Sequence, residues 1–370
     1  MNFKISKDLF LKKLNLLNKA ISSTCPFQVL NGIKVMITGN NLILVSSDGD
    51  LSIKCLLTAS DQLIINEEGT IVIDAKYLNE IIKKIDNEFI EIETIDTLYL
   101  KISGGKTEYK INCMDPIDFP NIAFVSTSSP IRFETASFNH LVSDTAFACD
   151  DKNVKPALNG INVSIKDNKL TLKGSNSFRI SINSIDVENK EDINITIPCK
   201  YLTSIVSCFE EAATFNLFID NNRILIEFDD NSFLLKIIDD EYPEIRQKNI
   251  SPANASTSIK CDVRSLKNAI DKISFIKEDG KSIIELNISM NGLEINTKNN
   301  ITSASDNVEL LEFNGTDLTI HMIADYLKDA LRVVRSNEVE IYFTGTLGII
   351  LVKDPLNDNT TQIISPYQIR

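Results

Sequence analysis

The chain has 370 residues, of which 43% are hydrophobic and 24% are charged, a balance typical of a globular protein with two or three domains. It contains no run of about 18 apolar residues, and residues 1–8 alternate between polar and apolar. The sequence therefore predicts neither a membrane span nor a secretory signal. The formal net charge of −13 argues, taken alone, against a nucleic-acid partner.

Seven cysteines are scattered along the chain without a C-x-x-C pair, and their number is odd. This pattern favours reduced, mostly buried thiols in a cytoplasmic protein over a disulfide framework. The cysteines are Cys25, Cys55, Cys113, Cys149, Cys199, Cys208 and Cys261.

One segment of the chain occurs three times. Asn31 to Val35 reads Asn-Gly-Ile-Lys-Val, and Asn159 to Val163, 128 residues later, reads Asn-Gly-Ile-Asn-Val. A third version begins at Ile284 and turns at Asn291-Gly292. Each version continues into further alternating segments after a short polar turn, which predicts a β-meander.

Three other features recur in the same order. Tyr77, Tyr201 and Tyr326 each stand near the start of an apolar-periodic stretch that follows a strand, and this periodicity predicts a helix. An aromatic-proline pair comes later in the first two repeats, at Phe119-Pro120 and Tyr242-Pro243. Each repeat also opens with a strand-to-helix step, in residues 3–21, 131–148 and 258–275.

The order and near-constant spacing of these features divide the chain into three repeats. We expect domains at residues 1–122, 123–252 and 253–370, joined by segments rich in Ser, Thr, Pro and Asn. Each repeat should hold two helices and about eight strands, so the expected fold class is α+β.

Lysines and arginines gather on the polar faces of the predicted helices. In the helix that starts near Arg264, Leu266 and Ile270 share one face, and Arg264 and Lys272 share the other. The alternative to a functional basic surface is that these lysines and arginines only keep the exposed helix faces solvated. If the repeats align their helices, the cations form a track that contacts phosphates without reading bases. The middle repeat fits least, and the candidates are Lys12, Lys19, Lys83, Lys84, Lys200, Arg264, Lys272, Lys328, Arg332 and Arg335.

No catalytic or cofactor motif is present in the sequence. The two histidines, His140 and His321, lack the spacing of a zinc site, and there is no Walker A, G-x-G-x-x-G or G-x-S-x-G motif. We therefore expect no catalytic residue, no metal and no cofactor. A metal-dependent nuclease or nucleotidyltransferase built on paired aspartates is the alternative, but every pair falls at a predicted turn, where Asp is favoured locally. The pairs are Asp48/Asp50, Asp150/Asp151 and Asp239/Asp240.

Several short motifs follow one another in a fixed order. They are Leu158-Asn159-Gly160, Gly174 to Ile180, Ile197-Pro198-Cys199-Lys200, Asp239 to Ile245, Ile323 to Leu331 with Tyr326 and Asp329, and Ile363 to Gln368. Together they resemble the bacterial sliding clamp family, the beta subunit of DNA polymerase III. Each motif alone is weak, but the order and spacing make the resemblance specific, and it covers the whole chain.

The resemblance implies a non-catalytic protein that forms a head-to-tail homodimer. Two chains of three DNA-clamp domains would close into a ring, with helices lining the inner face and antiparallel sheets outside. The first domain of one copy would pair with the third domain of the other. The ring would encircle double-stranded DNA without sequence preference and tether the DNA polymerase III alpha subunit by raising its effective concentration. A clamp loader would use ATP to open the ring, while this chain binds no nucleotide.

The resemblance also implies a groove into which the polymerase, the clamp loader and other partner proteins dock short peptides. Apolar walls with an Arg and Tyr rim suit a small hydrophobic anchor. The alternative is that Leu158, Ile180 and Leu347 are ordinary core residues. The matching positions are Leu158, Ser175, Ser177, Phe178, Arg179, Ile180, Pro243, Ile323, Tyr326, Leu347, Ile349, Pro366 and Tyr367.

The chain departs from the family pattern at four groove positions. Ser177-Phe178 replaces Gly-His, Ile323 replaces Asn, and Gln368 replaces the terminal Arg. We expect a more apolar groove with a changed peptide preference, and a diverged paralogue without a replication role is a competing hypothesis. The loop at residues 22–27 also lacks the usual basic residue before Pro, so Lys152 and Lys155 are expected to supply part of the DNA contact.

Overall fold

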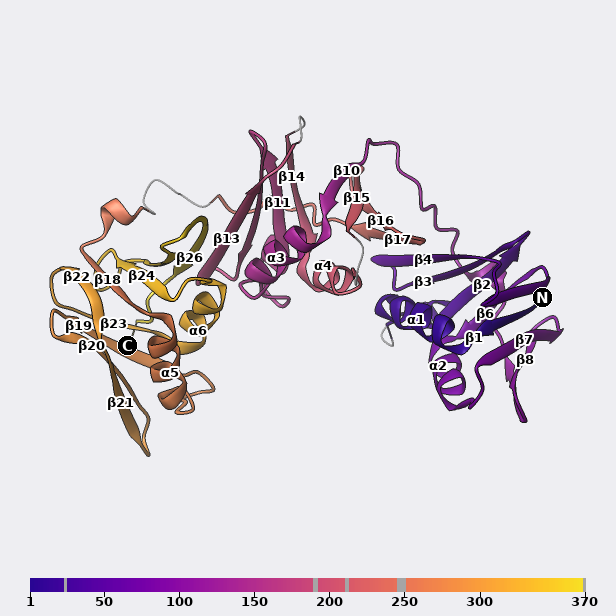
Figure 1. Ribbon diagram of the computed structural model, residues 1–370, viewed down its shortest axis with the longest axis horizontal. Helices are drawn as coiled ribbons and strands as arrows, with labels where there is room; N and C mark the ends of the chain where they lie inside the picture. The colour runs from indigo at the N-terminus through magenta and orange to yellow at the C-terminus, as the bar shows by residue number, and fades with distance from the viewer. Residues whose placement is uncertain (23–24, 189–191, 210–212, 245–250, 369–370) are drawn as a thin grey trace. The chain divides into compact units, whose positions relative to one another are not determined.

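The chain folds into two compact units (Figure 1). The computed structural model describes residues 1–22, 25–188, 192–209, 213–244 and 251–368. Unit 1 is Met1–Phe138 with Ser204–Ile237, and unit 2 is Asn139–Thr203 with Ile238–Arg370. The chain crosses from one unit to the other inside two helices of the second repeat, α3 (Thr135–Ala146) and α4 (Cys199–Val206). The sequence repeats and the compact units therefore divide the chain at different places.

Unit 1 holds an eight-stranded sheet in which all neighbouring strands are antiparallel. Its order is β10-β15-β16-β17-β4-β3-β2-β6. Strands of the first and second repeats thus belong to one sheet, joined where β4 meets β17. The strands are β2 (Gly32–Thr38), β3 (Asn41–Ser47), β4 (Leu51–Thr58), β6 (Gly69–Asp74), β10 (Ile131–Glu134), β15 (Thr214–Ile219), β16 (Arg223–Phe228) and β17 (Asn231–Lys236).

A second, five-stranded antiparallel sheet completes unit 1. Its order is β5-β1-β7-β8-β9. The strands are β1 (Asn2–Ser6), β5 (Leu63–Glu67), β7 (Phe89–Asp96), β8 (Tyr99–Gly104) and β9 (Thr107–Asn112). Strand β9 forms one edge of this sheet.

Two helices of unit 1, α1 (Lys7–Leu17) and α2 (Ala75–Lys84), pack against each other and against the sheets. Helix α1 buries Phe10 and Leu14 at helical spacing. A partly buried amide pair links the C-terminal end of α1 to α2, because the side chains of Asn18, which caps α1, and Asn79 exchange hydrogen bonds of 2.9 and 2.8 Å. Burying an amide costs free energy unless it is hydrogen-bonded, so this pair specifies one packing arrangement.

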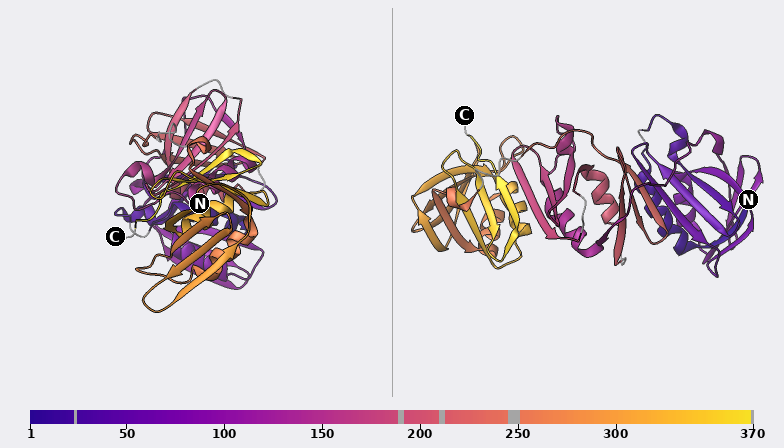
Figure 2. Two further views of the ribbon diagram at one scale, coloured as in Figure 1. Left: turned by 90° about the vertical axis from the view of Figure 1, so that its left-hand side faces the viewer. Right: turned by 90° about the horizontal axis from the view of Figure 1, so that it is seen from above.

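Unit 2 has a nine-stranded antiparallel sheet of order β14-β11-β12-β13-β26-β25-β24-β18-β22. The second and third repeats join where β13 meets β26, and Figure 2 shows the yellow C-terminal strands side by side. The strands are β11 (Gly160–Lys166), β12 (Lys169–Ser175), β13 (Arg179–Asp186), β14 (Ile193–Pro198), β18 (Thr257–Asp262), β22 (Leu310–Gly315), β24 (Glu338–Phe343), β25 (Ile350–Asp354) and β26 (Asn357–Ile364).

A four-stranded antiparallel sheet, of order β21-β20-β19-β23, completes unit 2. Strand β19 buries Ile284, Leu286 and Ile288 and leaves the residues between them partly exposed, as the two-residue period of a half-buried strand requires. The strands are β19 (Ile283–Ser289), β20 (Gly292–Lys298), β21 (Ser303–Val308) and β23 (Leu318–Ile323).

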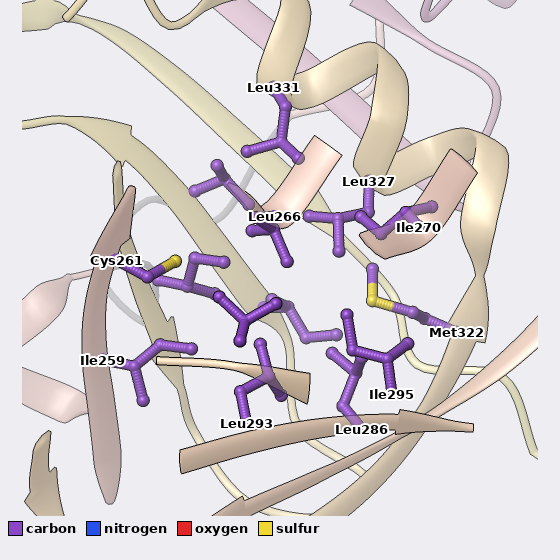
Figure 3. Close-up of a cluster of buried hydrophobic side chains, with 14 of the residues drawn as sticks. Ile259, Cys261, Leu266, Ile270, Leu286, Leu293, Ile295, Met322, Leu327 and Leu331 are labelled. Atoms are coloured by element: carbon purple, nitrogen blue, oxygen red, sulfur yellow. The ribbon is translucent and has the colours of Figure 1, made fainter. Parts of the chain in front are cut away.

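Helices α5 (Val263–Ile273) and α6 (Ala324–Val333) cover the core of unit 2 (Figure 3). Leu266 and Ile270 of α5 meet Leu327 of α6 above strands β19 and β20. Asp262 begins α5, since its carboxylate accepts the backbone N–H of Ser265 at 2.7 Å. That hydrogen bond lowers the pKa of Asp262, as expected for an N-cap carboxylate.

The structure confirms the predicted order of elements. Each repeat opens with a strand followed by a helix, and Tyr77, Tyr201 and Tyr326 are each the third residue of their helix. None of the seven cysteines, all of which lie in the described ranges, forms a disulfide bond. Among the described residues, no helix has both the length and the apolar character needed to cross a membrane.

Replacing Leu266 by alanine should lower the free energy of unfolding of unit 2 by about 2–5 kcal/mol, because Leu266 is fully buried and its loss leaves a cavity. Urea unfolding followed by circular dichroism measures this change. The matched control is Leu311→Ala on the exposed face of β22, which should change stability by no more than about 0.5 kcal/mol. Equal effects would contradict this account of the core.

Candidate functional site

A candidate site lies in unit 2, in a cavity of about 890 Å³ that we call the unit 2 groove. It lies beside the turn between β12 and β13 and beside the loop that follows β24. Nine predicted groove residues line it: Leu158, Ser175, Ser177, Phe178, Arg179, Ile180, Pro243, Leu347 and Ile349.

The turn between β12 and β13 is shaped by two polar side chains. Asn176 Oδ1 accepts the backbone N–H groups of Phe178 and Arg179, each at 3.0 Å. Ser175 Oγ accepts the N–H of Ser177 at 3.2 Å and donates to the carbonyl of Arg179 at 2.9 Å. Such local bonds are the reason Asn and Ser favour turns. The turn leaves the Phe178 ring exposed beside the cavity.

The backbone at Ser177 has a φ of 78°, in the left-handed region that favours glycine. Glycine is the residue that the family pattern places here. A serine held at this φ carries local backbone strain.

The walls of the unit 2 groove are apolar. Leu158 is buried at the end of a 3₁₀ turn, η4 (Pro156–Asn159), so it serves both the core and the cavity. Leu347 is 70% exposed, and the hypothesis that it is an ordinary core residue is therefore wrong. A cavity lined by an exposed leucine and a buried one is suited to bind an apolar anchor.

Arg179 forms the polar rim and is held on three sides. Its guanidinium donates to Asp329 Oδ2 at 2.6 Å and to the carbonyl of Phe147. It also lies over the Tyr326 ring, 4.7 Å from the centroid, and over the Phe147 ring at 5.2 Å. A planar cation is well suited to combine ion pairing with stacking, so the sequence motif around Tyr326 and Asp329 acts by positioning Arg179.

Four predicted groove residues do not line the cavity. Tyr326 lies behind Arg179 and accepts a hydrogen bond from Asn176 Nδ2 at 3.3 Å. Tyr367 donates its backbone N–H to the carbonyl of His321 at 2.7 Å and faces a different cavity. Ile323 ends β23, and Pro366 follows β26 without reaching the groove lining. The motif residue Ile245 lies outside the described residues.

Sequence reasoning missed several lining residues. Tyr242 belongs to a recognised motif, and its hydroxyl is buried without a hydrogen-bond partner among the described residues. Burial, followed by the nearby thiols of Cys149 and Cys199, raises the pKa of Tyr242 above its usual range. The other missed residues are Lys155, which was expected at DNA, and Glu244, Asn254, Thr344, Gly348, Ile363 and Ser365.

The basic residues expected to face DNA lie on the surface of the two units. All twelve are exposed except Lys328, which is partly buried. The loop at residues 22–27 is described except for Ser23 and Thr24, which lie outside the described residues. In unit 2 four of these cations are paired with aspartates: Lys272 with Asp306, Lys328 with Asp271, Arg332 with Asp329, and Arg335 with Asp144.

Acidic side chains lie beside these cations on the helices themselves. Asp271 and Asp329 stand on helices α5 and α6 beside the cations, and Asp144 stands on α3. Acidic residues are therefore not confined to strands and turns. The Lys328–Asp271 pair is largely exposed and contributes little net stability, so a phosphate can replace Asp271 at low cost, whereas the Asp144 partner of Arg335 is buried.

Lys267 is a basic residue that the sequence did not single out. It lies where α5 packs against α6, and burial followed by the charges of Arg332 and Arg335 lowers its pKa. Three cations thus act on one another at this helix pair. An anion bound there would relieve the repulsion, which makes the cluster a candidate phosphate contact.

The aspartate pairs act in turns, as expected. Asp48 Oδ1 accepts the backbone N–H groups of Asp50 and Leu51, and Asp150 Oδ1 accepts that of Lys152. Within the part of the chain that the structure describes, no three His, Cys, Asp or Glu side chains form a group able to hold a metal.

Replacing Ser177 by glycine should raise the free energy of unfolding of unit 2 by about 1 kcal/mol. Left-handed strain of about 1–3 kcal/mol is removed, and the added freedom of the unfolded chain offsets about 0.4–1 kcal/mol of that gain. Urea unfolding measures the change. The same substitution at Ser303, in strand β21, should instead lower stability by about 0.5–1 kcal/mol. A loss of stability in both variants would rule out strain at Ser177.

Comparison with known proteins places this geometry in one family. Models of the DNA polymerase III beta subunit match the chain with their N-terminal domain at residues 1–123, their central domain at 132–244 and their C-terminal domain at 248–368. Beta sliding clamps of Staphylococcus aureus and Staphylococcus epidermidis are 27% and 26% identical, covering 100% of this chain and 99% of each relative.

Solved structures agree with the family models. The Bacillus subtilis DNA polymerase sliding clamp has a TM-score of 0.94 at 24% identity, and a putative DNA polymerase III beta subunit from Eubacterium rectale has 0.92 at 25%. Both comparisons cover 100% of each chain. This chain belongs to the DNA polymerase III beta subunit family, the sliding clamps, whose members are non-catalytic subunits.

Proposed function

We propose that two copies of this chain close head to tail into a ring around duplex DNA and tether the DNA polymerase III alpha subunit there. Each chain of this ring has three domains, with boundaries at about residues 122 and 252. The ring acts in the cytoplasm without a cofactor. This proposal rests on one observation: strands from neighbouring repeats pair with each other and form one continuous sheet.

Each junction between repeats uses the same two strands. In unit 1, β4 of the first repeat pairs with β17, the last strand of the second repeat. In unit 2, β13 of the second repeat pairs with β26, the last strand of the third. Strands β4 and β13 occupy the same place in their meanders. At both junctions, therefore, the third meander strand of one repeat pairs with the last strand of the next repeat.

Two corresponding strands remain at sheet edges. Strand β21 is the third meander strand of the third repeat, and β9 is the last strand of the first repeat. Among the described strands, β21 pairs only with β20 and β9 only with β8. Exposed edges favour pairing with another chain, so β21 of one copy and β9 of its partner would complete a closed ring.

The internal repeat also sets the register of this interface. Phe233 pairs with Ile53 at the first junction, and the corresponding residues in β9 and β21 are Tyr109 and Ala304. We therefore expect Tyr109 of one copy to stand opposite the partner's Ala304.

The exposed cations of helices α1, α2, α4, α5 and α6 would contact phosphates, together with Lys152 and Lys155. Contacts to phosphates alone carry no sequence information, which suits a protein that must slide. Lys267, which the sequence did not single out, lies where α5 packs against α6 near Arg332 and Arg335, and it would add to this contact.

The unit 2 groove would bind short segments of the polymerase, of the clamp loader and of other partner proteins. Its apolar walls and its Arg179 rim support this role. A diverged paralogue without a replication role is the second candidate, because Ser177, Phe178, Ile323 and Gln368 depart from the family pattern. The family assignment favours the clamp.

Sedimentation at low micromolar concentration should show a species of twice the 41.4 kDa chain mass. A chain carrying Tyr109→Cys and Ala304→Cys should form a crosslinked dimer on mild oxidation, since the two positions face each other in the proposed register. Crosslinked rings should stay on nicked circular DNA and slip from linear DNA.

Each single-cysteine variant is the matched control and should not crosslink above the level set by the seven native cysteines. A monomer that persists as concentration rises would contradict the ring. A dimer that crosslinks equally well with a cysteine at Ile64, on β5, would contradict the register.

Replacing Leu347 by alanine should weaken binding of a polymerase tail peptide about 5- to 20-fold, because removing a buried anchor contact costs about 1–2 kcal/mol. Fluorescence polarisation with a labelled peptide measures the affinity. Leu356→Ala is the matched control, because Leu356 is an exposed leucine of unit 2 outside the groove. A clamp requires tight wild-type binding, and absence of binding would favour the paralogue.

A further inference from the structure

Unit 1 contains the same turn that shapes the unit 2 groove. Asp48 stands 128 residues before Asn176, and its Oδ1 also accepts the N–H groups two and three residues ahead, at 3.0 and 2.9 Å. Ser47 Oγ accepts the N–H of Gly49 at 3.1 Å, as Ser175 accepts that of Ser177. Gly49 has a φ of 97° where Ser177 has 78°. The two turns therefore have one construction.

The segment that packs beneath the turn, which we call the floor of the groove, is also repeated. The penultimate residue of the 3₁₀ turn η2 (Gln28–Asn31) is a buried leucine, Leu30, as Leu158 is in η4. A glycine follows each of them, because the neighbouring chain leaves no room for a Cβ: Gly32 lies against Val72 and Met114, and Gly160 lies against Thr196 and Ile238. The close approach holds both floors in place.

A cavity of about 560 Å³ lies above this floor, and we call it the unit 1 groove. All of its lining residues belong to unit 1. Its apolar wall includes Phe27, which is 67% exposed although it is aromatic, together with Pro26, Val29, Leu30, Pro120 and Ile122. An exposed aromatic beside an apolar cavity is a feature of binding sites.

The two grooves carry opposite charge. Among the described lining residues of the unit 1 groove, Asp48, Asp50 and Asp118 stand with one cation, Lys236, which pairs with Asp50 at 3.2 Å. The described lining of the unit 2 groove has Lys155 and Arg179 with one carboxylate, Glu244. The unit 1 groove is therefore an apolar seat with an acidic rim.

We propose that the unit 1 groove is a second docking site, for a short linear peptide segment in which lysines or arginines flank one large apolar anchor. The apolar walls would bury the anchor, and the acidic rim would attract the flanking cations and repel acidic peptides. This site goes beyond the proposed function and does not depend on ring closure, since one unit holds the whole groove.

The test uses the full chain and two labelled peptides of equal length. Both carry Leu-Phe at the centre, flanked by two lysines on each side in one peptide and by two glutamates in the other. Fluorescence polarisation at low salt should show the lysine peptide binding at least tenfold more tightly. Raising the salt concentration should weaken its binding, because the rim contacts are exposed.

Variants locate the binding site. Phe27→Ala should weaken binding of the lysine peptide at least fivefold, and Ile64→Ala is the matched control, since Ile64 is an exposed apolar residue of unit 1 outside the groove. Asp50→Asn with Asp118→Asn should weaken it about tenfold. The same two changes at Asp61 and Asp86 alter the net charge equally without touching the groove and should have little effect.

Leu347→Ala separates the two grooves and should leave binding of the lysine peptide unchanged. The proposal is overturned if the lysine peptide does not bind, or if it binds no better than the glutamate peptide. It is also overturned if Leu347→Ala abolishes binding while Phe27→Ala does not, because the peptide would then occupy the unit 2 groove. None of these outcomes affects the ring, which sedimentation tests separately.

Discussion

The pairing of the third meander strand of one repeat with the last strand of the next is the constraint on which this structure depends. It occurs twice, as β4 with β17 and as β13 with β26. Backbone groups buried in a sheet must find hydrogen-bond partners, so each junction is continuous sheet and not a flexible hinge. The compact units consequently cut through the second repeat, since each half of it is bound more closely to a neighbouring repeat than to its other half.

Both grooves form at these junctions, and the reason is local. The turn before β4 or β13 must bend where the strand begins to pair with the next repeat. Asp48 and Asn176 supply equivalent hydrogen bonds to that bend. A groove is thus a by-product of joining two repeats, and its specificity depends on the few side chains that differ. Arg179 has Leu51 as its counterpart, which is fully buried, so the rim of the unit 1 groove takes its charge from aspartates.

Local patterns predicted the repeats and the helices, because these depend on spacing along the chain, whereas the groove positions came from the family resemblance. Phe178, which lies in the Gly174 to Ile180 motif, and Leu347 are both exposed at the cavity. Ile363 and Ser365 lie in the C-terminal motif but were not assigned to the groove, because it is the pairing of β13 with β26 that brings them to the cavity. Lys267 was missed for a similar reason. Its environment depends on the packing of α5 against α6, which the amphipathic pattern of α5 alone does not specify.

The electrostatics resolve the apparent conflict between a net charge of −13 and a DNA partner. A ring that slides must attract phosphates without holding any one of them tightly. In the proposed ring, Asp271 beside Lys328 and Asp329 beside Arg332 would compete with phosphate for these cations. Exposed pairs of this kind exchange partners at low cost, and counterion release still favours contact with DNA. The acidic excess thus moderates the basic helix faces, and weak, replaceable contacts are compatible with movement along the duplex.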